Sequence, residues 1–313
     1  MNLQQLKYLC AVVDNGLNVS DAAEALYTSQ PGISKQVRQL EDELGLRVFV
    51  RQGKRLTALT PAGEVVVATA RRALREVANL KRVAEEYRAE DAGVLVISTT
   101  HTQARYVLPP VLARFAARFP KVRLVLHQGN PVQVAEQTLS GAADLGIATE
   151  ALATSTHLVT LPCYQWNRGV LVTKGHPLAD VHPLTLEAVA AYPLVTYDFA
   201  FTGRSAMNAA FAARGLEPNV VLAALDADVI KTYVELGMGV GIIATMAFDA
   251  VKDTGFDMLD VGHLFAASTT RVALRKGVFL RGYMYEFITL FAPQYARRDI
   301  DAALTGEASV DIL

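Results

Sequence analysis

The chain has 313 residues, of which 51% are hydrophobic and 19% are charged, and its formal net charge is −1. These values are typical of a globular protein of two or three domains. Because the net charge is near zero, the chain could bind nucleic acid only through a local basic surface. No apolar run approaches the ~18 residues that span a bilayer, and the N-terminus lacks the apolar core of a signal peptide, so we expect a cytoplasmic protein without a membrane segment.

The first 60 residues predict a helix-turn-helix. Four apolar residues at three- and four-residue spacings indicate an amphipathic first helix: Leu3, Leu6, Leu9 and Val13. Asn18 is placed to cap a second helix, and Ser29 to cap a third, which Gly45 ends. Because only a tight turn separates the second and third helices, we expect the third to enter the major groove of DNA.

The outer face of the third helix and the segment that follows it are polar and basic. A solvated helix face is the alternative to a DNA contact, but residues 46–60 carry four basic residues and no acid, and they read as two short strands around Gln52 and Gly53. Such a basic wing supplies the positive charge that phosphate binding needs, so we predict a winged helix-turn-helix. The residues expected to contact DNA are Gln30, Pro31, Ser34, Lys35, Arg38, Arg51 and Lys54.

Residues 61–90 predict one long linker helix. Its apolar positions alternate four- and three-residue steps, which is typical of a coiled-coil seam. They are Val66, Ala70, Ala73, Val77, Leu80, Ala84 and Tyr87. We favour a dimerisation helix, because a pair of winged heads needs a spacer to reach two half-sites; a helix packed on its own domain is the alternative.

From residue 91 onwards, strands alternate with helices. This order predicts parallel α/β sheets, and roughly 200 residues is generous for one sheet, so we expect two lobes like those of periplasmic binding proteins. Lobe I is expected at about 91–162 and 267–300, and lobe II at about 163–266. The fold class is therefore α/β, with a winged helix-turn-helix, a linker helix and a two-lobed effector domain over 91–313.

Two strand-to-helix turns look suited to a ligand between these lobes. One is ISTTHTQARY, from residue 97, and the other leads from Tyr197 to Thr202-Gly203-Arg204-Ser205. Each offers hydroxyls and backbone N–H groups at a helix N-terminus, which suit a carboxylate, sulfate or phosphate. A single threonine at such a turn could instead serve only to cap the helix. Two hydroxyl-rich turns of the same kind favour an anion site.

Other candidate sites are weaker. GMGVGI at 237–242 follows a helix and precedes a strand, the reverse of a dinucleotide fingerprint. His101 has no second ligand residue at metal spacing, and Cys10 and Cys163 lie far apart, so we expect neither a metal nor a cofactor. No serine stands in a nucleophile elbow, and we expect no enzyme. A secreted anion-binding protein would explain 91–300 but not the first 60 residues.

The chain resembles LysR-type transcriptional regulators of the CysB type. The motifs that carry the resemblance are TTHTQARYVLP, LPCYQWNR, PLVTYDFAFTGRS, DADVIKTYVELGMGVG and FLRGYMYEFI. Asp198 and Ala200 depart from the family pattern. The resemblance implies a homotetramer that binds promoter DNA of cysteine and sulfur-assimilation genes and acts on RNA polymerase.

The resemblance also implies a small anionic effector, N-acetylserine or a sulfate-like anion. The residues that would contact it are Thr100, Thr102, Gln103, Thr149, Trp166 and Thr202. Sister regulators of sulfonate use share most of these motifs and respond to another sulfur metabolite, so that alternative stays open.

Overall fold

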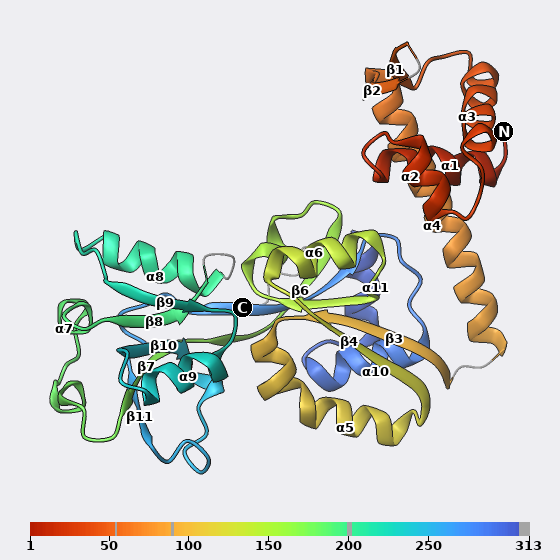
Figure 1. Cartoon of the computed structure of the whole chain (residues 1–313). Coiled ribbons are helices and arrows are strands. Elements are labelled where there is room, and N and C mark those ends of the chain that lie inside the picture. Colours follow the sequence, from red (N-terminus) through yellow and green to blue (C-terminus); the bar gives the residue numbers. More distant parts are fainter. Residues whose placement is uncertain (54, 89–90, 199–201, 307–313) are drawn as a thin grey trace. The chain divides into compact units, whose positions relative to one another are not determined.

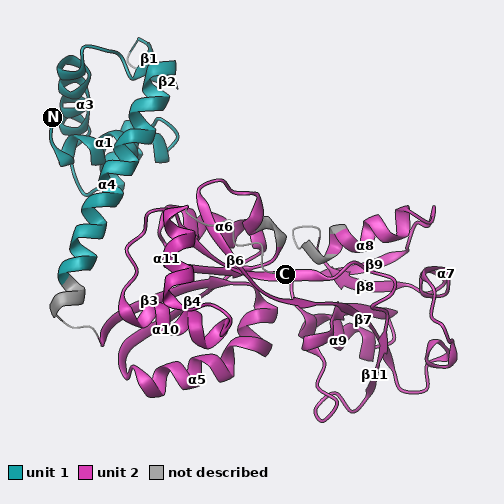
Figure 2. Cartoon of the chain, turned by 180° about the vertical axis from the view of Figure 1, so that it is seen from behind, with its two compact units in different colours: residues 1–88 teal, residues 89–313 magenta. Residues whose placement is uncertain are grey.

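The computed structural model describes residues 1–53, 55–88, 91–198 and 202–306. The chain forms two compact units, residues 1–88 and residues 89–313, which are coloured separately in Figure 2. Among the helices of the described residues, none is both long enough and apolar enough to cross a membrane.

The N-terminal unit begins with three helices, α1 (Leu3–Asp14), α2 (Val19–Ala25) and α3 (Gln30–Leu44). The predicted caps are confirmed. The side chain of Asn18 accepts hydrogen bonds from the N–H groups that open α2, Ser29 accepts one from the N–H of Gly32, and Gly45 ends α3 with a φ of 66°. These caps satisfy backbone groups that the helices leave unpaired, and they fix where α2 and α3 meet.

The core of this unit joins α1, α2, α3 and a two-stranded wing. Ala22 and Ala23 are buried, and their small side chains let α2 cross close to α3. The wing consists of β1 (Phe49–Gln52) and β2 (Arg55–Leu59), which pair antiparallel as predicted. Val48 and Phe49 are buried in the same core and therefore anchor the wing beside α3.

The linker helix α4 (Pro61–Arg88) has two different halves. Val67 and Ala70 belong to the core of the N-terminal unit, and Val66 and Ala73 pack against it. The first positions of the predicted seam therefore pack against their own domain. Further along, Leu80 is 69% exposed.

The C-terminal unit contains two five-stranded sheets, and each defines a lobe. Lobe I has the strand order β4-β3-β5-β12-β6: β3 (Ala92–Thr99), β4 (Lys121–Gln128), β5 (Leu145–Ala148), β6 (Leu158–Trp166) and β12 (Ser268–Arg275). Lobe II has the order β11-β7-β10-β8-β9: β7 (Arg168–Thr173), β8 (Leu194–Tyr197), β9 (Val220–Ala224), β10 (Val240–Ala244) and β11 (Phe256–Asp260). The chain crosses between the lobes at Asn167 and again between β11 and β12, so the expected boundary at 162–163 falls inside β6.

The sheets are mixed, which corrects the expectation of parallel sheets. β3 is parallel to β4 and β5, and β8 is parallel to β9 and β10. In contrast, β12 runs antiparallel to β5 and β6, and β7 runs antiparallel to β10 and β11. The antiparallel strands include those that carry the chain out of one lobe and back from the other.

Helices cover both faces of each sheet. In lobe I, α5 (Leu108–Arg118) and α10 (Gly282–Phe291) pack together on one face, α6 (Pro131–Ser140) lies on the other (Figure 1), and α11 (Arg297–Thr305) contacts β6. In lobe II, α7 (Leu186–Ala190) and α8 (Thr202–Ala212) flank one face and α9 (Ala227–Glu235) the other. Between β3 and α5 the chain forms an unpredicted π-helix, η1 (Gln103–Val107).

Candidate functional site

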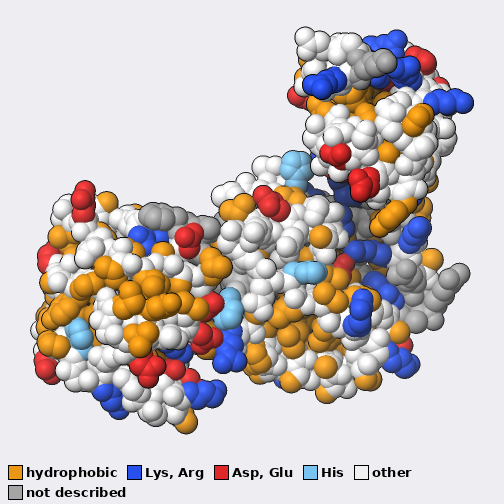
Figure 3. All heavy atoms as spheres, in the orientation of Figure 1, with side chains coloured by type: hydrophobic (Ala, Val, Ile, Leu, Met, Phe, Trp, Pro, Cys, Tyr) orange, Lys and Arg blue, Asp and Glu red, His pale blue; other side chains and the backbone are white. Residues whose placement is uncertain are grey.

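A groove of about 650 Å³ lies between α3 and the wing. Six of the seven residues predicted to contact DNA line it: Gln30, Pro31, Ser34, Lys35, Arg38 and Arg51. The seventh, Lys54, lies outside the described residues. Lys35 and Arg38 are exposed, while Ile33 and Val37 are buried on the opposite side of α3. Lys and Arg side chains gather around the wing end of this unit (Figure 3).

Arg51 also has a structural role, through the buried carboxylate of Glu41. Oε1 of Glu41 accepts the N–H groups of Val48, at 2.8 Å, and Phe49, at 3.2 Å, and Oε2 accepts a 2.8 Å bond from Arg51. Burial raises the pKa of Glu41, but the bonds from Arg51 and the two N–H groups outweigh it, so the net pKa is lowered. Glu41 therefore fixes the start of the wing on α3, a role that its sequence position did not reveal.

The predicted effector residues of lobe I gather at the carboxyl ends of its strands. Thr100 follows β3 and Thr149 follows β5, and these two strands are parallel neighbours, with Thr99 paired to Ile147. Both Thr100 and Thr149 are buried. Ligands of open α/β sheets bind beyond such strand ends.

Gln103 is held inside lobe I. It is 2% exposed, its Oε1 accepts a hydrogen bond from the hydroxyl of Tyr164, and its Nε2 donates a 3.1 Å bond to Oγ1 of Thr270. Both amide ends are thus occupied by β6 and β12. The sequence did not indicate Tyr164 and Thr270 as partners of Gln103, and their bonds hold its side chain against the sheet of lobe I.

Tyr197, at the end of β8 in lobe II, contacts Thr102 of lobe I. Its phenol oxygen accepts a 3.3 Å bond from the N–H of Ala244 and hydrogen-bonds the side chain of Thr102, and burial raises its pKa. Thr202 is the first residue of α8, but its side chain lies outside the described residues, as does Ala200. Thr102 is thus in direct contact with the other lobe.

The acid at Asp198 lies near a buried guanidinium. Arg204 is 5% exposed, donates from Nε to Oδ1 of Asn208 at 2.9 Å and from an NH group to the carbonyl of Tyr197 at 3.3 Å, and interacts electrostatically with Asp198. Burial lowers the pKa of Arg204, and the charge of Asp198 raises it in part. The unusual acid is therefore offset by a neighbouring cation.

Trp166 lies at the end of β6, where the chain leaves lobe I. The centre of its ring lies 5.2 Å from the guanidinium carbon of Arg168. The NH groups of the same guanidinium donate to Oγ of Ser268, at 2.8 Å, and to the carbonyl of Ala266, at 2.9 Å. Arg168 thereby ties the two lobe-crossing segments together. Within the described part of the chain, the indole Nε1 of Trp166 is buried and has no hydrogen-bond partner. A ligand oxygen would satisfy such a donor.

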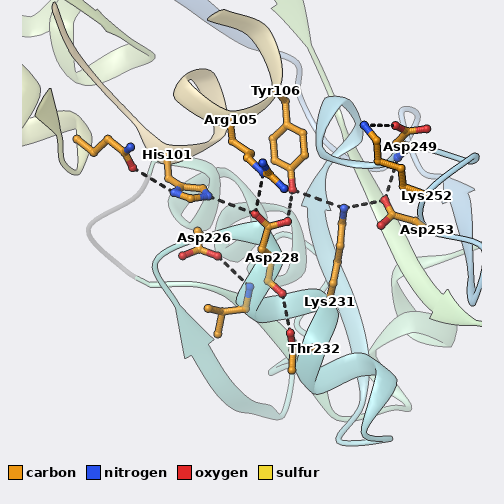
Figure 4. Close-up of polar contacts among 12 residues, drawn as sticks. His101, Arg105, Tyr106, Asp226, Asp228, Lys231, Thr232, Asp249, Lys252 and Asp253 are labelled. Carbon is orange, nitrogen blue, oxygen red and sulfur yellow. Dashed lines mark hydrogen bonds and ion pairs between the residues drawn. The ribbon is translucent and has the colours of Figure 1, made fainter. Parts of the chain in front are cut away.

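A polar cluster joins the lobes beside this site (Figure 4). The hydroxyl of Tyr106 donates a 2.6 Å bond to Oδ1 of Asp228, and Oδ2 of Asp228 lies 3.4 Å from Nε of Arg105 and 3.5 Å from Nε2 of His101. Burial raises the pKa of Asp228, but the bonds from Tyr106 and His101 and the charges of Arg105 and Lys231 outweigh it and lower the pKa overall. The prediction that His101 has no partner is wrong, because its partner stands 127 residues later, in lobe II.

Together, the fold and these sites define a class of protein: a DNA-binding head joined by a helix to a two-lobed ligand sensor. Two family models cover most of the chain, "Bacterial regulatory helix-turn-helix protein, lysR family" over residues 3–64 and "LysR substrate binding domain" over residues 88–296. The chain belongs to the LysR family of transcriptional regulators, which are not enzymes. This confirms the predicted family and fold class.

Similar relatives include regulators of the CysB, SsuR and Cbl type. The chain is 52% identical to the HTH-type transcriptional regulator CysB of Burkholderia cenocepacia, with 98% of each chain covered. It is 54% identical to the regulator SsuR of the same organism, covering 98% of this chain and all of SsuR. The solved cofactor-binding domain of the Cbl transcriptional regulator superposes with a TM-score of 0.66 at 44% identity, covering 68% of this chain and 93% of that domain.

Proposed function

We propose that this regulator controls genes of sulfur assimilation and cysteine synthesis in response to N-acetylserine or a sulfate-like anion bound between its lobes. The observation that carries the proposal is the buried, unpartnered indole N–H of Trp166 at the lobe crossing. Thr100 and Thr149 add hydroxyls at neighbouring strand ends, and Thr102 adds one that touches lobe II. Hydroxyl and N–H donors suit the oxygens of a small anion.

DNA reading is proposed for the groove between α3 and the wing. Gln30, Ser34, Lys35 and Arg38 would face base edges and phosphates, and Arg51 would add charge from the wing while holding Glu41. The exposed part of α4 would pair two chains, and pairs would assemble into the tetramer that acts on promoter DNA and RNA polymerase.

Effector binding is proposed to act through lobe closure. Thr102 and Tyr197 meet across the lobes, and so do Tyr106 and Asp228, so the relative position of the lobes determines whether these bonds form. An effector can shift this equilibrium only by the difference of its affinities for the two arrangements. The lobes would then set the geometry of the tetramer and the spacing of its DNA-reading heads.

A sister function, regulation of sulfonate use, is the second candidate. It is favoured by one observation: the identity to SsuR, 54%, is as high as the identity to CysB, 52%. The two candidates differ in the effector and in the genes controlled.

Calorimetry on the full chain distinguishes these functions. Separate titrations with N-acetylserine, sulfate, thiosulfate and adenylyl sulfate are compared. Tightest binding of N-acetylserine supports the cysteine-pathway regulator, and tightest binding of adenylyl sulfate supports the sister regulator. Binding of none of the four would overturn the proposed effector class. The replacement Thr102→Ala should weaken the effector that binds while leaving promoter affinity without effector unchanged, and Thr160→Ala, on β6, is the matched control.

A further inference from the structure

We infer that His101, Asp226 and Asp228 form a binding site for a divalent transition-metal cation of the zinc class that bridges the two lobes. His101 stands at the end of β3 in lobe I, whereas Asp226 and Asp228 stand at the start of α9 in lobe II. One ligand atom from each of the three residues lies within 4.8 Å of the other two. Figure 4 shows the imidazole directed at the carboxylate of Asp228, with Asp226 beside it.

The hydrogen bond on the far side of the imidazole determines what can lie between His101 and Asp228. Nδ1 of His101 is 3.2 Å from Oε1 of Gln128. An amide oxygen only accepts, so Nδ1 carries the proton and donates it. With the proton on Nδ1, Nε2 can give its lone pair to a cation, and it lies 3.5 Å from Oδ2 of Asp228; without a cation, a protonated Nε2 can donate to that oxygen instead.

The distance between these two atoms is compatible with a metal ion between them. A charge-assisted N–H···O bond is about 2.7–2.9 Å long, clearly shorter than the separation of Nε2 and Oδ2. Two ligand atoms bound to one tetrahedral zinc ion at about 2.1 Å lie about 3.4 Å apart. Imidazole with carboxylates is a donor set that suits zinc, and a ligand histidine whose other N–H bonds a carbonyl is the usual supporting arrangement.

Each carboxylate has one oxygen, Oδ1, fixed by a hydrogen bond within the protein; Oδ2 of Asp228 faces His101 and Arg105. Oδ1 of Asp228 accepts the hydroxyl of Tyr106 at 2.6 Å, and Oδ1 of Asp226 accepts the N–H of Val229 at 2.9 Å. The side chains are thus oriented by partners that a metal would not displace. A hollow of about 370 Å³, lined in part by His101, Gln128 and Asp226, gives an ion access and leaves room for a water ligand.

Two cationic side chains near the site, Arg105 and Lys231, would repel a metal ion. Arg105 can turn into solvent, and Lys231 is paired with another carboxylate. Arg105 contacts Oδ2 of Asp228 at 3.4 Å, but its side chain is 63% exposed and can turn into solvent. Lys231 forms a 2.7 Å ion pair with Asp253. The two carboxylates of the site balance the charge of a divalent ion once Arg105 has withdrawn.

Bridging the lobes has a consequence that rests on the proposed effector function. A cation that needs His101 and Asp228 close together stabilises the arrangement in which they meet. By linkage it changes the affinity of an effector that prefers the same arrangement, and the effector changes the affinity for the metal by the same factor.

The test is calorimetric titration of zinc chloride into the full chain, without an affinity tag and after dialysis against a chelator. We expect one zinc ion per chain, and at least tenfold weaker binding in His101→Gln, which loses the ligand nitrogen. Asp226→Asn is the second variant, because an amide oxygen still caps α9 but carries no charge. His127→Gln, at an exposed position one residue before Gln128, is the matched control and should bind zinc as the unmodified chain does.

Circular dichroism of each metal-free variant checks that it is folded. The absence of zinc binding by the unmodified chain would overturn the inference. So would equal affinity of the unmodified chain, His101→Gln and Asp226→Asn. Repeating the effector titrations without metal separates the two proposals, since effector binding that persists when zinc binding fails refutes only the metal site.

Discussion

The hydroxyl of Tyr106 donates a 2.6 Å hydrogen bond to Oδ1 of Asp228, and so joins the π-helix after β3 in lobe I to α9 in lobe II. Nζ of Lys231 lies 5.3 Å from the centre of the same tyrosine ring. Burial and the bond to Asp228 raise the pKa of Tyr106, so the phenol stays protonated and keeps donating at neutral pH. This bond therefore stabilises one relative position of the lobes.

Replacing Tyr106 with Phe should favour separation of the lobes. The ring remains, but the carboxylate of Asp228 loses a donor, at a cost of about 1 kcal/mol. An effector that prefers the joined lobes should then bind about fivefold more weakly. Calorimetry measures the affinity, and small-angle scattering of the effector-free chain measures the change in dimensions. Tyr233→Phe, on α9, is the control; an equal loss of affinity in that variant would contradict the role of the Tyr106 hydroxyl.

Trp166 should report effector binding by its fluorescence. It is the single tryptophan of the chain, so the emission comes from the lobe crossing alone. A ligand oxygen that accepts the indole N–H changes the polarity around the ring, and the emission maximum or intensity should change in a saturable way. Serine serves as the control for N-acetylserine. Saturable effector binding in calorimetry without any change in emission would place the effector away from Trp166.

Arg38→Ala should weaken promoter binding. If Arg38 contacts a phosphate, affinity falls equally for all DNA sequences, and the slope of log affinity against log salt concentration falls by about 1. If Arg38 contacts a base, discrimination between bases falls by about 1–3 kcal/mol at one position of the site. Gel-shift titrations at several salt concentrations separate these outcomes. Arg72→Ala, on the exposed surface of α4, should leave affinity unchanged. Affinity like that of the unmodified chain would show that α3 does not read DNA.

Glu41→Gln should destabilise the N-terminal unit at neutral pH, by about 1.5–3 kcal/mol, because a buried charge-assisted network loses its charge. The folded-state pKa of Glu41 is lowered from its ordinary value of 4.5, so its contribution is complete above that value and is lost as the pH falls through the folded pKa. Urea unfolding at pH 7 and at pH 3.5 should therefore show a smaller difference between variant and unmodified chain at the lower pH. A difference that does not change with pH would contradict the charged state of Glu41.

Local chemistry made much of the fold predictable. Asn18, Ser29 and Gly45 mark helix ends by hydrogen bonding and backbone conformation alone, and short apolar runs mark strands such as β3 and β10. β6 is harder to predict, because Pro162 interrupts its apolar run. β6 is the edge strand of its sheet, where a residue without an N–H is tolerated, and its pairing with β12 changes register beside Pro162, between Thr270 and Arg271.

The interlobe contacts were not predictable from sequence. His101 and Asp228 are 127 residues apart, and each looks like an ordinary polar residue at a helix start. They meet only because the chain crosses between the lobes twice. The family resemblance implies Gln103 as a ligand contact, whereas in the structure its amide bonds Tyr164 and Thr270, which come from other strands of the same lobe.

Leu80→Glu in α4 should weaken self-association. The first positions of the coiled-coil seam pack on the N-terminal unit, whereas Leu80 is 69% exposed within one chain, and burial of such a side chain between two helices stabilises a dimer by about 1.5–3 kcal/mol. A glutamate there brings two like charges together across the pair and should raise the dissociation constant at least tenfold, measured by sedimentation equilibrium. Val65→Glu is the matched control, because Val65 is 67% exposed on the same helix and lies off the seam. Equal dissociation of both variants would mean that any charge on α4 disrupts assembly, and an unchanged Leu80→Glu oligomer would show that α4 does not form the interface.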